Sequence, residues 1–290
     1  MTTADATLRR GLARHGDDLR LTLDPRFQGL PGAAHGGSVL AAFHAVAGLA
    51  GGQAVRGLYR KRVPLGTPLG LTLARRDGGF ACRLFDETDA VLVEGSVTAA
   101  EATTDIGTDS TFVAVRGGDP LPISSTCYAC GIDNPLGLRV GLSFDDTAVG
   151  GVWQPRETMA MADGSLAPIA LTTLLDEAAF WLGALASGES GMTIDLAITL
   201  HGPVAFGTPI TIAGARARTR QRPDDERYWD TEVAAREASG RVVASARITF
   251  VAVRGAARRL VTGLLSMNAP EIVRRVFPAY KRRHYPDREP

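Results

Sequence analysis

Cysteine, lysine and aromatic residues are scarce in this chain of 290 residues, which contains 3 cysteines and 6% aromatic residues. So few cysteines exclude a small secreted protein held together by disulfides. Lysine occurs only at Lys61 and Lys281, so the basic side chains are almost all arginine. No apolar run approaches the roughly 18–20 residues of a membrane span. The longest apolar stretch, from Val39 to Gly51, contains His44. We therefore expect no membrane partner.

The chain also lacks an excess of charge of either sign. It has 32 Lys and Arg against 31 Asp and Glu, which leaves a formal net charge of +1. A nucleic-acid-binding protein would need a basic surplus to neutralise phosphates, so we expect no nucleic-acid partner. The N-terminal region carries charged residues between Arg9 and Asp18 where a secretory leader would be apolar. These features predict a cytoplasmic protein.

An internal repeat is present instead. Residues 63–69 (VPLGTPL) match residues 204–210 (VAFGTPI), at an offset of 141 positions. Such self-similarity indicates a duplicated structural unit.

Two further pairs of segments follow the same order in both halves of the chain. Residues 38–49 and 170–182 are long, apolar and free of proline, which predicts a buried helix in each half. Residues 91–98 and 242–249 alternate sufficiently to be strands. Agreement of three elements in one order predicts two copies of a single unit, residues 1–116 and 124–254.

The remaining segments connect and extend these units. Residues 117–123 are rich in glycine and proline and are predicted to form a linker. Residues 255–290 should form a C-terminal helix and tail. We expect the helix to begin with Asn268 as N-cap and Glu271 three residues on, and to end near Phe277. The charged tail from residue 281 onward should be frayed.

Three sequence motifs resemble those of one enzyme family. The loop Gly29–Gly37 (GLPGAAHGG), the stretch 127–138 (CYACGIDNPLGL) and residues 174–178 (LLDEA) resemble acyl-CoA thioesterases related to the phenylacetate-pathway and 4-hydroxybenzoyl-CoA enzymes. The resemblance implies an α+β fold, a tandem (double) hotdog in which each unit has a long central helix wrapped by an antiparallel sheet. The two units would form a pseudo-dimer with a continuous sheet, and two such molecules could pair as a homodimer.

The resemblance also implies site residues. In that family, the glycine after the histidine is thought to polarise the thioester carbonyl, and a carboxylate follows eight residues later. In the first copy this spacing pairs Gly36 with His44, and in the second copy it pairs Pro168 with Asp176. Each copy therefore keeps one half of the pattern and has lost the other.

Helix geometry explains why a single composite site is expected. Eight residues span about 12 Å along a helix, so Asp176 cannot serve the N-terminus of its own helix. Proline has no N–H to donate, so the site that pairs Pro168 with His44 should be inactive. Catalysis is expected from Asp176, the amides of Gly36 and Gly37, and His35, while Glu177, about 100° away around the helix, is expected to be structural.

Substrate-binding residues are predicted from the loop and from the arginines. The family places an amide side chain at the position of Gly29, and Gln28 lies one residue earlier. Arg60, Arg62, Arg216 and Arg218 are candidates to bind the phosphates of coenzyme A, the last two as a stripe on a strand. Coenzyme A would be part of the substrate, and no other cofactor is expected.

A metal site is not expected from the cysteines. Cys127 and Cys130 form a CxxC pair, but no second CxxC or HxxxH pair is present to complete the four ligands of zinc. Cys82 and His201 could act as further metal ligands only if the fold happened to bring them close to this pair.

Three functions remain open at this stage. The first is a thioesterase that hydrolyses an acyl-CoA or an acyl group on a carrier protein. The second is a hotdog-type dehydratase or hydratase, in which His35 and Asp176 would move protons to and from an acyl chain. The third is a non-catalytic protein that binds an acyl group or another ligand.

Overall fold

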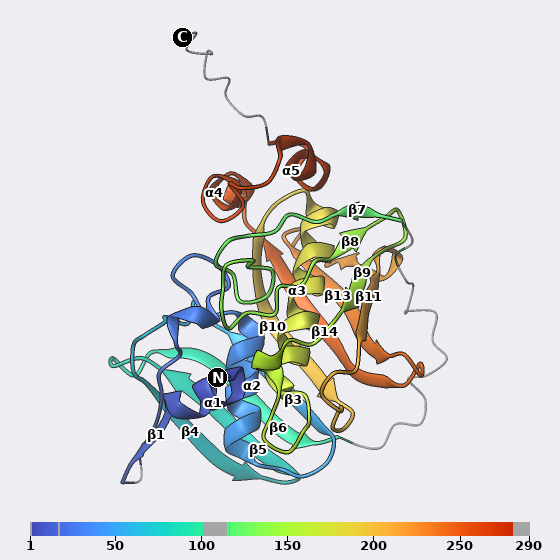
Figure 1. Cartoon of the computed structure of the whole chain (residues 1–290). Coiled ribbons are helices and arrows are strands. Elements are labelled where there is room, and N and C mark those ends of the chain that lie inside the picture. Colours follow the sequence, from blue (N-terminus) through green and yellow to red (C-terminus); the bar gives the residue numbers. More distant parts are fainter. Residues whose placement is uncertain (1, 17, 101–114, 116, 281–290) are drawn as a thin grey trace, which may run out of the picture.

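One antiparallel sheet runs through the whole molecule (Figure 1). The computed structural model of the chain describes residues 2–16, 18–100, 115 and 117–280. The N-terminal half contributes β1 (Leu12–His15), β2 (Asp18–Leu21), β3 (Gln53–Tyr59), β4 (Leu69–Arg76), β5 (Gly79–Phe85) and β6 (Val91–Ala99). The C-terminal half contributes β7 (Asp119–Pro120), β8 (Ser143–Phe144), β9 (Ala148–Trp153), β10 (Gly191–Leu200), β11 (Ile210–Ala215), β12 (Arg220–Gln221), β13 (Tyr228–Glu237) and β14 (Val242–Ala252).

The order of the strands repeats outward from the centre of the sheet. From the central pair, one half continues β3-β6-β5-β4-β2 and the other continues β10-β14-β13-β11-β9. β3 and β10 join the halves as antiparallel neighbours, with Leu58 opposite Asp195 at one end and Gln53 opposite Leu200 at the other. The tandem arrangement with a continuous sheet is therefore confirmed.

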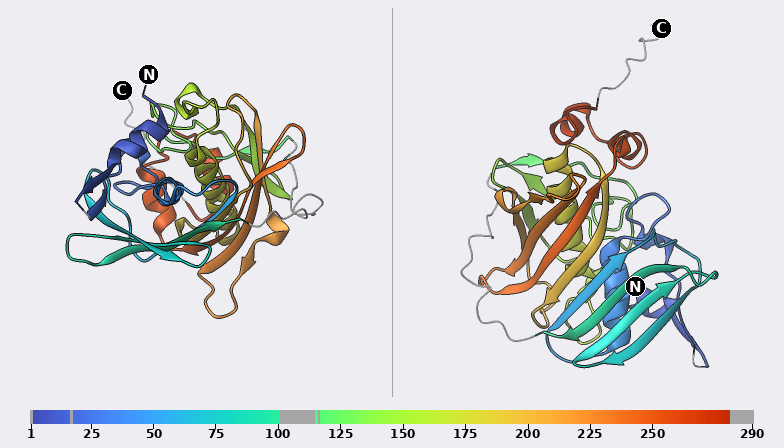
Figure 2. Two further views of the ribbon diagram at one scale, coloured as in Figure 1. Left: turned by 90° about the horizontal axis from the view of Figure 1, so that it is seen from below. Right: turned by 180° about the vertical axis from the view of Figure 1, so that it is seen from behind.

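Each half of the sheet packs against one long helix, as the apolar segments predict. α2 (Gly36–Ala47) and α3 (Pro168–Ser187) lie inside the curve of the sheet, which Figure 2 shows end-on. The shorter helices are α1 (Ala4–Gly11), α4 (Ala256–Thr262) and α5 (Pro270–Val276), with 3-10 turns η1 (Pro25–Phe27), η2 (Glu157–Met159) and η3 (Arg216–Arg218).

α3 has 20 residues, and an 18-residue window of this helix has a mean hydropathy of 1.4, which meets the length and composition of a membrane span. The expectation that no segment does so is wrong. However, 83% of the apolar part of this helix is buried inside the protein, as in a core helix. The apolar composition is thus explained by burial, because α3 contacts the sheet, α2 and a loop at once.

The repeated sequence motif marks the entrance to a strand in each half. Residues 63–69 and 204–210 end at the first residues of β4 and β11. Gly66 and Gly207 are the matching glycines, and their φ angles of 68° and 90° lie in the left-handed region that favours glycine. The motif was preserved in both copies because the turn requires a residue without a Cβ.

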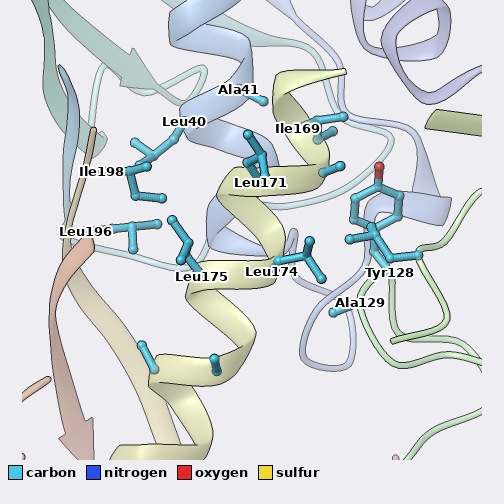
Figure 3. Close-up of a cluster of buried hydrophobic side chains, with 14 of the residues drawn as sticks. Leu40, Ala41, Tyr128, Ala129, Ile169, Leu171, Leu174, Leu175, Leu196 and Ile198 are labelled. Atoms are coloured by element: carbon cyan, nitrogen blue, oxygen red, sulfur yellow. The ribbon is translucent and has the colours of Figure 1, made fainter. Parts of the chain in front are cut away.

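The N-terminus of α2 crosses α3 at very short range. A Cβ on Gly37 would lie 2.5 Å from the carbonyl oxygen of Thr172, so only glycine fits there. The Thr172 hydroxyl donates a hydrogen bond to the Gly37 carbonyl oxygen at 2.7 Å. Around this crossing, leucines of α3 pack against α2, β10 and a loop of the C-terminal half (Figure 3), and the labelled side chains are Leu40, Ala41, Tyr128, Ala129, Ile169, Leu171, Leu174, Leu175, Leu196 and Ile198.

The connecting segments differ from the sequence prediction. Residues 117–123, predicted as a linker, contain β7, which pairs with β8 at the edge of the sheet. The C-terminal region has two helices, because α4 precedes the predicted one. α5 starts at Pro270 with Ala269 as N-cap, whereas the Asn268 side chain bonds the backbone of Ile123 and so cannot cap the helix. The predicted frayed tail from residue 281 lies outside the described residues.

The helix crossing leads to a stability prediction. Gly37→Ala should lower the free energy of unfolding by about 1–3 kcal/mol, because the new methyl group meets backbone on α3 that cannot move aside. Gly141→Ala is the matched control, since nothing lies within 4 Å of its Cβ position, and it should change stability by less than about 0.5 kcal/mol. Urea denaturation of both variants measures this, and equal stabilities would show that the helices can separate at no cost.

Candidate active site

A cavity of about 190 Å³ lies at the crossing, between the loop that precedes α2, the middle of α3, the ends of β3 and β10, and α4. Its walls are mainly apolar, with basic side chains on one side. The residues that line it are Gly29, Leu30, Ala33, Ala34, His35, Gly36, Tyr59, Arg60, Lys61, Arg62, Val63, Cys127, Cys130, Asp176, Glu177, Phe180, Trp181, Met192, Thr193, Ile194, Leu260, Leu264 and Leu265.

His35 and Asp176 meet at the floor of this cavity. Nδ1 of His35 lies 3.0 Å from Oδ2 of Asp176, an ion-pair distance, although the N–H is not aligned for a hydrogen bond. The two residues are 6% and 4% exposed. Burial disfavours both charges, but the mutual attraction outweighs it. The pKa of His35 is therefore raised well above its ordinary value and that of Asp176 is lowered.

The Asp176 carboxylate is held at the N-terminus of the other helix. Its Oδ2 accepts a hydrogen bond from the Gly37 amide at 3.1 Å, and its Oδ1 accepts one from the Thr193 hydroxyl at 2.7 Å. β10 has a bulge between Thr193 and Asp195 in its pairing with β14, next to this hydrogen bond. Both carboxylate oxygens thus face donors, which favours the ionised form.

The Gly36 amide remains available for a ligand. Gly36 is the first residue of α2 and lines the cavity, and its N–H has no hydrogen-bond partner in the part of the chain that the structure describes. The Tyr59 hydroxyl donates to the Gly36 carbonyl oxygen at 2.7 Å. Of the two amides predicted to face a substrate, Gly37 is already bonded to Asp176, so Gly36 alone is free.

Glu177 also belongs to the site, which the sequence did not indicate. Its Oε2 lies 3.5 Å from Nε2 of His35, and its Oε1 accepts a hydrogen bond from the Trp181 indole at 2.9 Å. The imidazole ring lies between the two adjacent acids, with Nδ1 toward Asp176 and Nε2 toward Glu177. The 100° turn between successive helix residues therefore does not keep Glu177 away from His35.

Cys127 and Cys130 line the same cavity from the loop that opens the second copy. This loop packs on the first copy, where the Tyr128 amide donates to the Gln28 carbonyl oxygen at 2.6 Å. A hydrogen bond from the Cys130 thiol lowers the pKa of Cys127, and the same bond together with burial raises the pKa of Cys130. No spacing in the sequence indicates that this loop reaches His35.

The counterpart of this site in the second copy has the predicted residues. Pro168 is the first residue of α3, so the position equivalent to Gly36 offers no N–H. His44 is half-buried on α2 near Arg9 and Asp5 of α1, and burial lowers its pKa. α1 packs against both α2 and η2 beside this second site. At the first site, the loop that opens the second copy occupies the corresponding place.

The predicted substrate-binding residues divide into two groups. Arg60 and Arg62 line the cavity. Arg216 and Arg218 do not, because η3 replaces the expected strand and the alternate positions no longer share a face. Arg218 instead lines a separate pocket with Arg56 on the outer face of the sheet.

Gln28 does not line the cavity either. Its side chain donates to the Thr126 hydroxyl at 2.9 Å and accepts a bond from the Gly32 amide at 3.4 Å. It thus joins the two loops that flank the cavity.

The buried ion pair can be tested by a double-mutant cycle. His35→Gln should cost about 3–5 kcal/mol of stability, because Asp176 and Glu177 are left without a buried cation. The variant that also carries Asp176→Asn should lose less than the two single losses combined, by about 0.5–3 kcal/mol. As a control, Asp195→Asn breaks an exposed pair with Arg56 and should cost about 0–1 kcal/mol. Urea denaturation of all four variants measures the coupling, and strict additivity would contradict the pair.

Comparison with known proteins gives matches only among solved structures. No protein-family model and no curated protein sequence matches the chain. A protein provisionally described as thioesterase II from Thermobifida fusca superposes with a TM-score of 0.60 at 18% identity, covering 87% of this chain and 98% of that one. A protein of unknown function with a hot dog fold from Alicyclobacillus acidocaldarius superposes with a TM-score of 0.55 at 9% identity, covering 87% of this chain and 99% of that one.

A dehydratase is similar as well. An inactive variant of the CurJ dehydratase superposes with a TM-score of 0.50 at 11% identity, covering 90% of this chain and 91% of that one. Identities this low establish the architecture alone. Taken with the two helices inside one continuous sheet, these matches show that the chain has a double hotdog fold.

Proposed function

We propose that this protein is a thioesterase that hydrolyses an acyl-CoA or an acyl group on a carrier protein. The observation that carries the proposal is the free Gly36 amide beside the Asp176 carboxylate, in a cavity with mainly apolar walls. One copy provides the hydrogen-bond donor and the other provides the carboxylate.

The reaction would use the Gly36 amide to stabilise charge on the carbonyl oxygen of the thioester. The amide is the first of α2, so the positive end of the helix dipole supports it. Loss of one such donor typically costs about 2.7–4 kcal/mol of transition-state stabilisation. The mainly apolar walls lower the local dielectric constant, which strengthens this interaction.

Asp176 would supply the base or the nucleophile. As a base it takes a proton from a water molecule whose oxygen attacks the carbonyl carbon; the carbon–sulfur bond then breaks and the thiolate leaves. As a nucleophile its own oxygen attacks the carbonyl carbon, the carbon–sulfur bond breaks and the thiolate leaves, and water then hydrolyses the mixed anhydride. Both routes need the ionised carboxylate, which the Gly37 amide and the Thr193 hydroxyl favour.

The mouth of the cavity suits a phosphate-bearing carrier. Arg60, Lys61 and Arg62 follow β3 and line the cavity side by side. Arg60 pairs with Glu94 at 3.0 Å, and both side chains are about half exposed, so this pair is weak enough to exchange for a phosphate. Coenzyme A or a phosphopantetheine arm fits this charge pattern.

Dehydration is the second candidate, favoured by the contact between His35 and Asp176 across the two copies. A dehydratase needs an acid that protonates the departing hydroxyl group. The hydrogen bonds to both oxygens of Asp176 favour its ionised form, which suits a base or nucleophile for hydrolysis, and for this reason we rank hydrolysis ahead of dehydration.

Thiol release from acyl-CoAs tests the proposed reaction. The wild type should release free thiol from at least one of a panel of short, long and aromatic acyl-CoAs. Asp176→Asn should lower kcat about 10²–10⁴-fold, because the base is lost while the side-chain size is kept. Asp195→Asn, an acid on the same sheet outside the cavity, should leave kcat unchanged.

The outcomes of this assay separate the hypotheses. Release that survives Asp176→Asn would keep the thioesterase class and refute the site. If no acyl-CoA or acyl-carrier protein releases thiol, hydrolysis is refuted, and loss of enoyl-thioester absorbance on hydration then tests the dehydratase.

The leucine side chains of the C-terminal region lead to a prediction about the length of the acyl chain that the cavity accepts. Leu260, Leu264 and Leu265 close the apolar end of the cavity. Leu264→Trp should shift the preference toward shorter acyl chains, with kcat/KM for the longest good substrate reduced at least about tenfold, since one or two methylene groups are worth about 1–3 kcal/mol. Met267→Trp, exposed on the same segment, is the control and should leave the preference unchanged. An unaltered chain-length profile in Leu264→Trp would show that these leucines do not limit the length of the acyl chain.

A further inference from the structure

Three side chains of metal-binding type converge beside the cavity from three separate segments. His35 precedes α2, Cys127 lies in the loop that opens the second copy, and Glu177 lies on α3. One ligand atom from each lies within 4.8 Å of the other two, and all three residues are buried. Imidazole, thiolate and carboxylate are the donors that zinc takes in proteins.

The spacing of these atoms suits a tetrahedral ion. Nε2 of His35 and Oε2 of Glu177 are 3.5 Å apart. Two ligands bound to tetrahedral zinc at about 2.0–2.1 Å are about 3.4 Å apart. The two atoms are therefore already at the separation of ligands that share one ion.

Outer hydrogen-bonding groups are arranged as they are around metal ligands. The second nitrogen of His35, Nδ1, faces the Asp176 carboxylate, so Nε2 is left for a metal. The second oxygen of Glu177 accepts a hydrogen bond from the Trp181 indole at 2.9 Å, which orients Oε2. Glu177 thus has a hydrogen-bond donor on its second oxygen, and Nδ1 of His35 lies within ion-pair distance of a carboxylate.

A fourth donor lies next to this cluster. Cys130 is buried and lines the same cavity as Cys127 and Glu177. A CxxC pair in one turn commonly supplies two zinc ligands. Rotation of this side chain would complete a set of two sulfurs, one nitrogen and one oxygen.

We propose that His35, Cys127 and Glu177, with Cys130 as the fourth donor, bind one divalent metal ion of the zinc class. The ion joins the loop before α2, the loop that opens the second copy, and α3. It needs the thiol protons of Cys127 and Cys130 to leave and His35 to be neutral, so binding releases protons to solvent. The site uses neither the Gly36 amide nor the carboxylate oxygens of Asp176 as ligands, and the proposal does not rest on the proposed hydrolysis.

Cobalt binding to the reduced, metal-stripped full-length protein tests the site. Addition of Co²⁺ should give the visible absorption of a tetrahedral ion together with a near-ultraviolet thiolate-to-cobalt charge-transfer band, saturating at one ion per chain. Stoichiometric Zn²⁺ should abolish both bands. Cys127→Ser should lower the intensity of the charge-transfer band by about half, because one of two thiolate ligands is lost, and should bind Co²⁺ at least tenfold more weakly, whereas Cys82→Ser, a buried cysteine on β5, should behave as wild type.

A second variant distinguishes loss of the metal site from a general folding defect. Trp181→Phe keeps an aromatic side chain and all the ligands but removes the indole donor, so it should retain the cobalt spectrum with affinity reduced about 10–100-fold. Wild-type protein that shows no tetrahedral cobalt spectrum at micromolar to millimolar Co²⁺ overturns the proposal. An unchanged spectrum in Cys127→Ser overturns it as well.

Metal binding and thiol release are separate measurements on the same protein. A protein that binds cobalt but cleaves no acyl thioester retains the metal site and refutes the proposed function. A protein that cleaves thioesters and binds no cobalt supports the proposed function and refutes the metal site.

Discussion

The approach of the N-terminus of α2 to the middle of α3 is the contact on which the rest of the site depends. Gly36 and Gly37 allow it, because a Cβ at Gly36 would meet Asp176 Oδ2 at 2.8 Å and one at Gly37 would meet the backbone of Thr172. The missing side chains let a carboxylate of one helix reach the amide groups that begin the other. The same approach brings His35, the residue before α2, against Asp176 and Glu177.

Duplication within one chain makes the two halves of the molecule chemically different. A homodimer would repeat each residue in both sites, whereas here Gly36 and Asp176 remain at one site and Pro168 and His44 occupy the equivalent positions at the other. Proline is stable in the first turn of a helix, so the loss of its N–H does not disturb α3. The fold is therefore retained in both halves while the hydrogen-bond donor and the carboxylate persist together at one crossing only.

The segment that opens each copy and the C-terminal helices determine what surrounds the site. The loop that opens the second copy places Cys127 and Cys130 beside His35, and α4 with the residues after it closes the apolar end of the cavity. At the equivalent position of the other site, α1 packs against α2 and η2. These segments explain why an apolar cavity with a charged floor lies at the crossing that retains the Gly36 amide.

The sequence by itself determined the fold and the pairing of the two copies. Apolar helices and alternating strands are local features, and their repetition in one order predicts two copies of a single unit. The resemblance to the thioesterase family implies the double hotdog and the pairing of Gly36 with Asp176. Only the tertiary structure shows which other groups lie beside Gly36 and Asp176. Tyr59, Thr193 and the CxxC pair lie at a distance from Gly36 and Asp176 in the chain, and no spacing links them to these residues. Glu177 follows Asp176 directly, but its contact with His35 depends on how the helices pack. Arg216 and Arg218 were assigned to the cavity wrongly, because a 3-10 turn and a strand are not distinguished by a short alternating run of arginines. Contacts of this kind depend on how whole elements pack, which is fixed by the sum of buried surface over many residues and by no single motif.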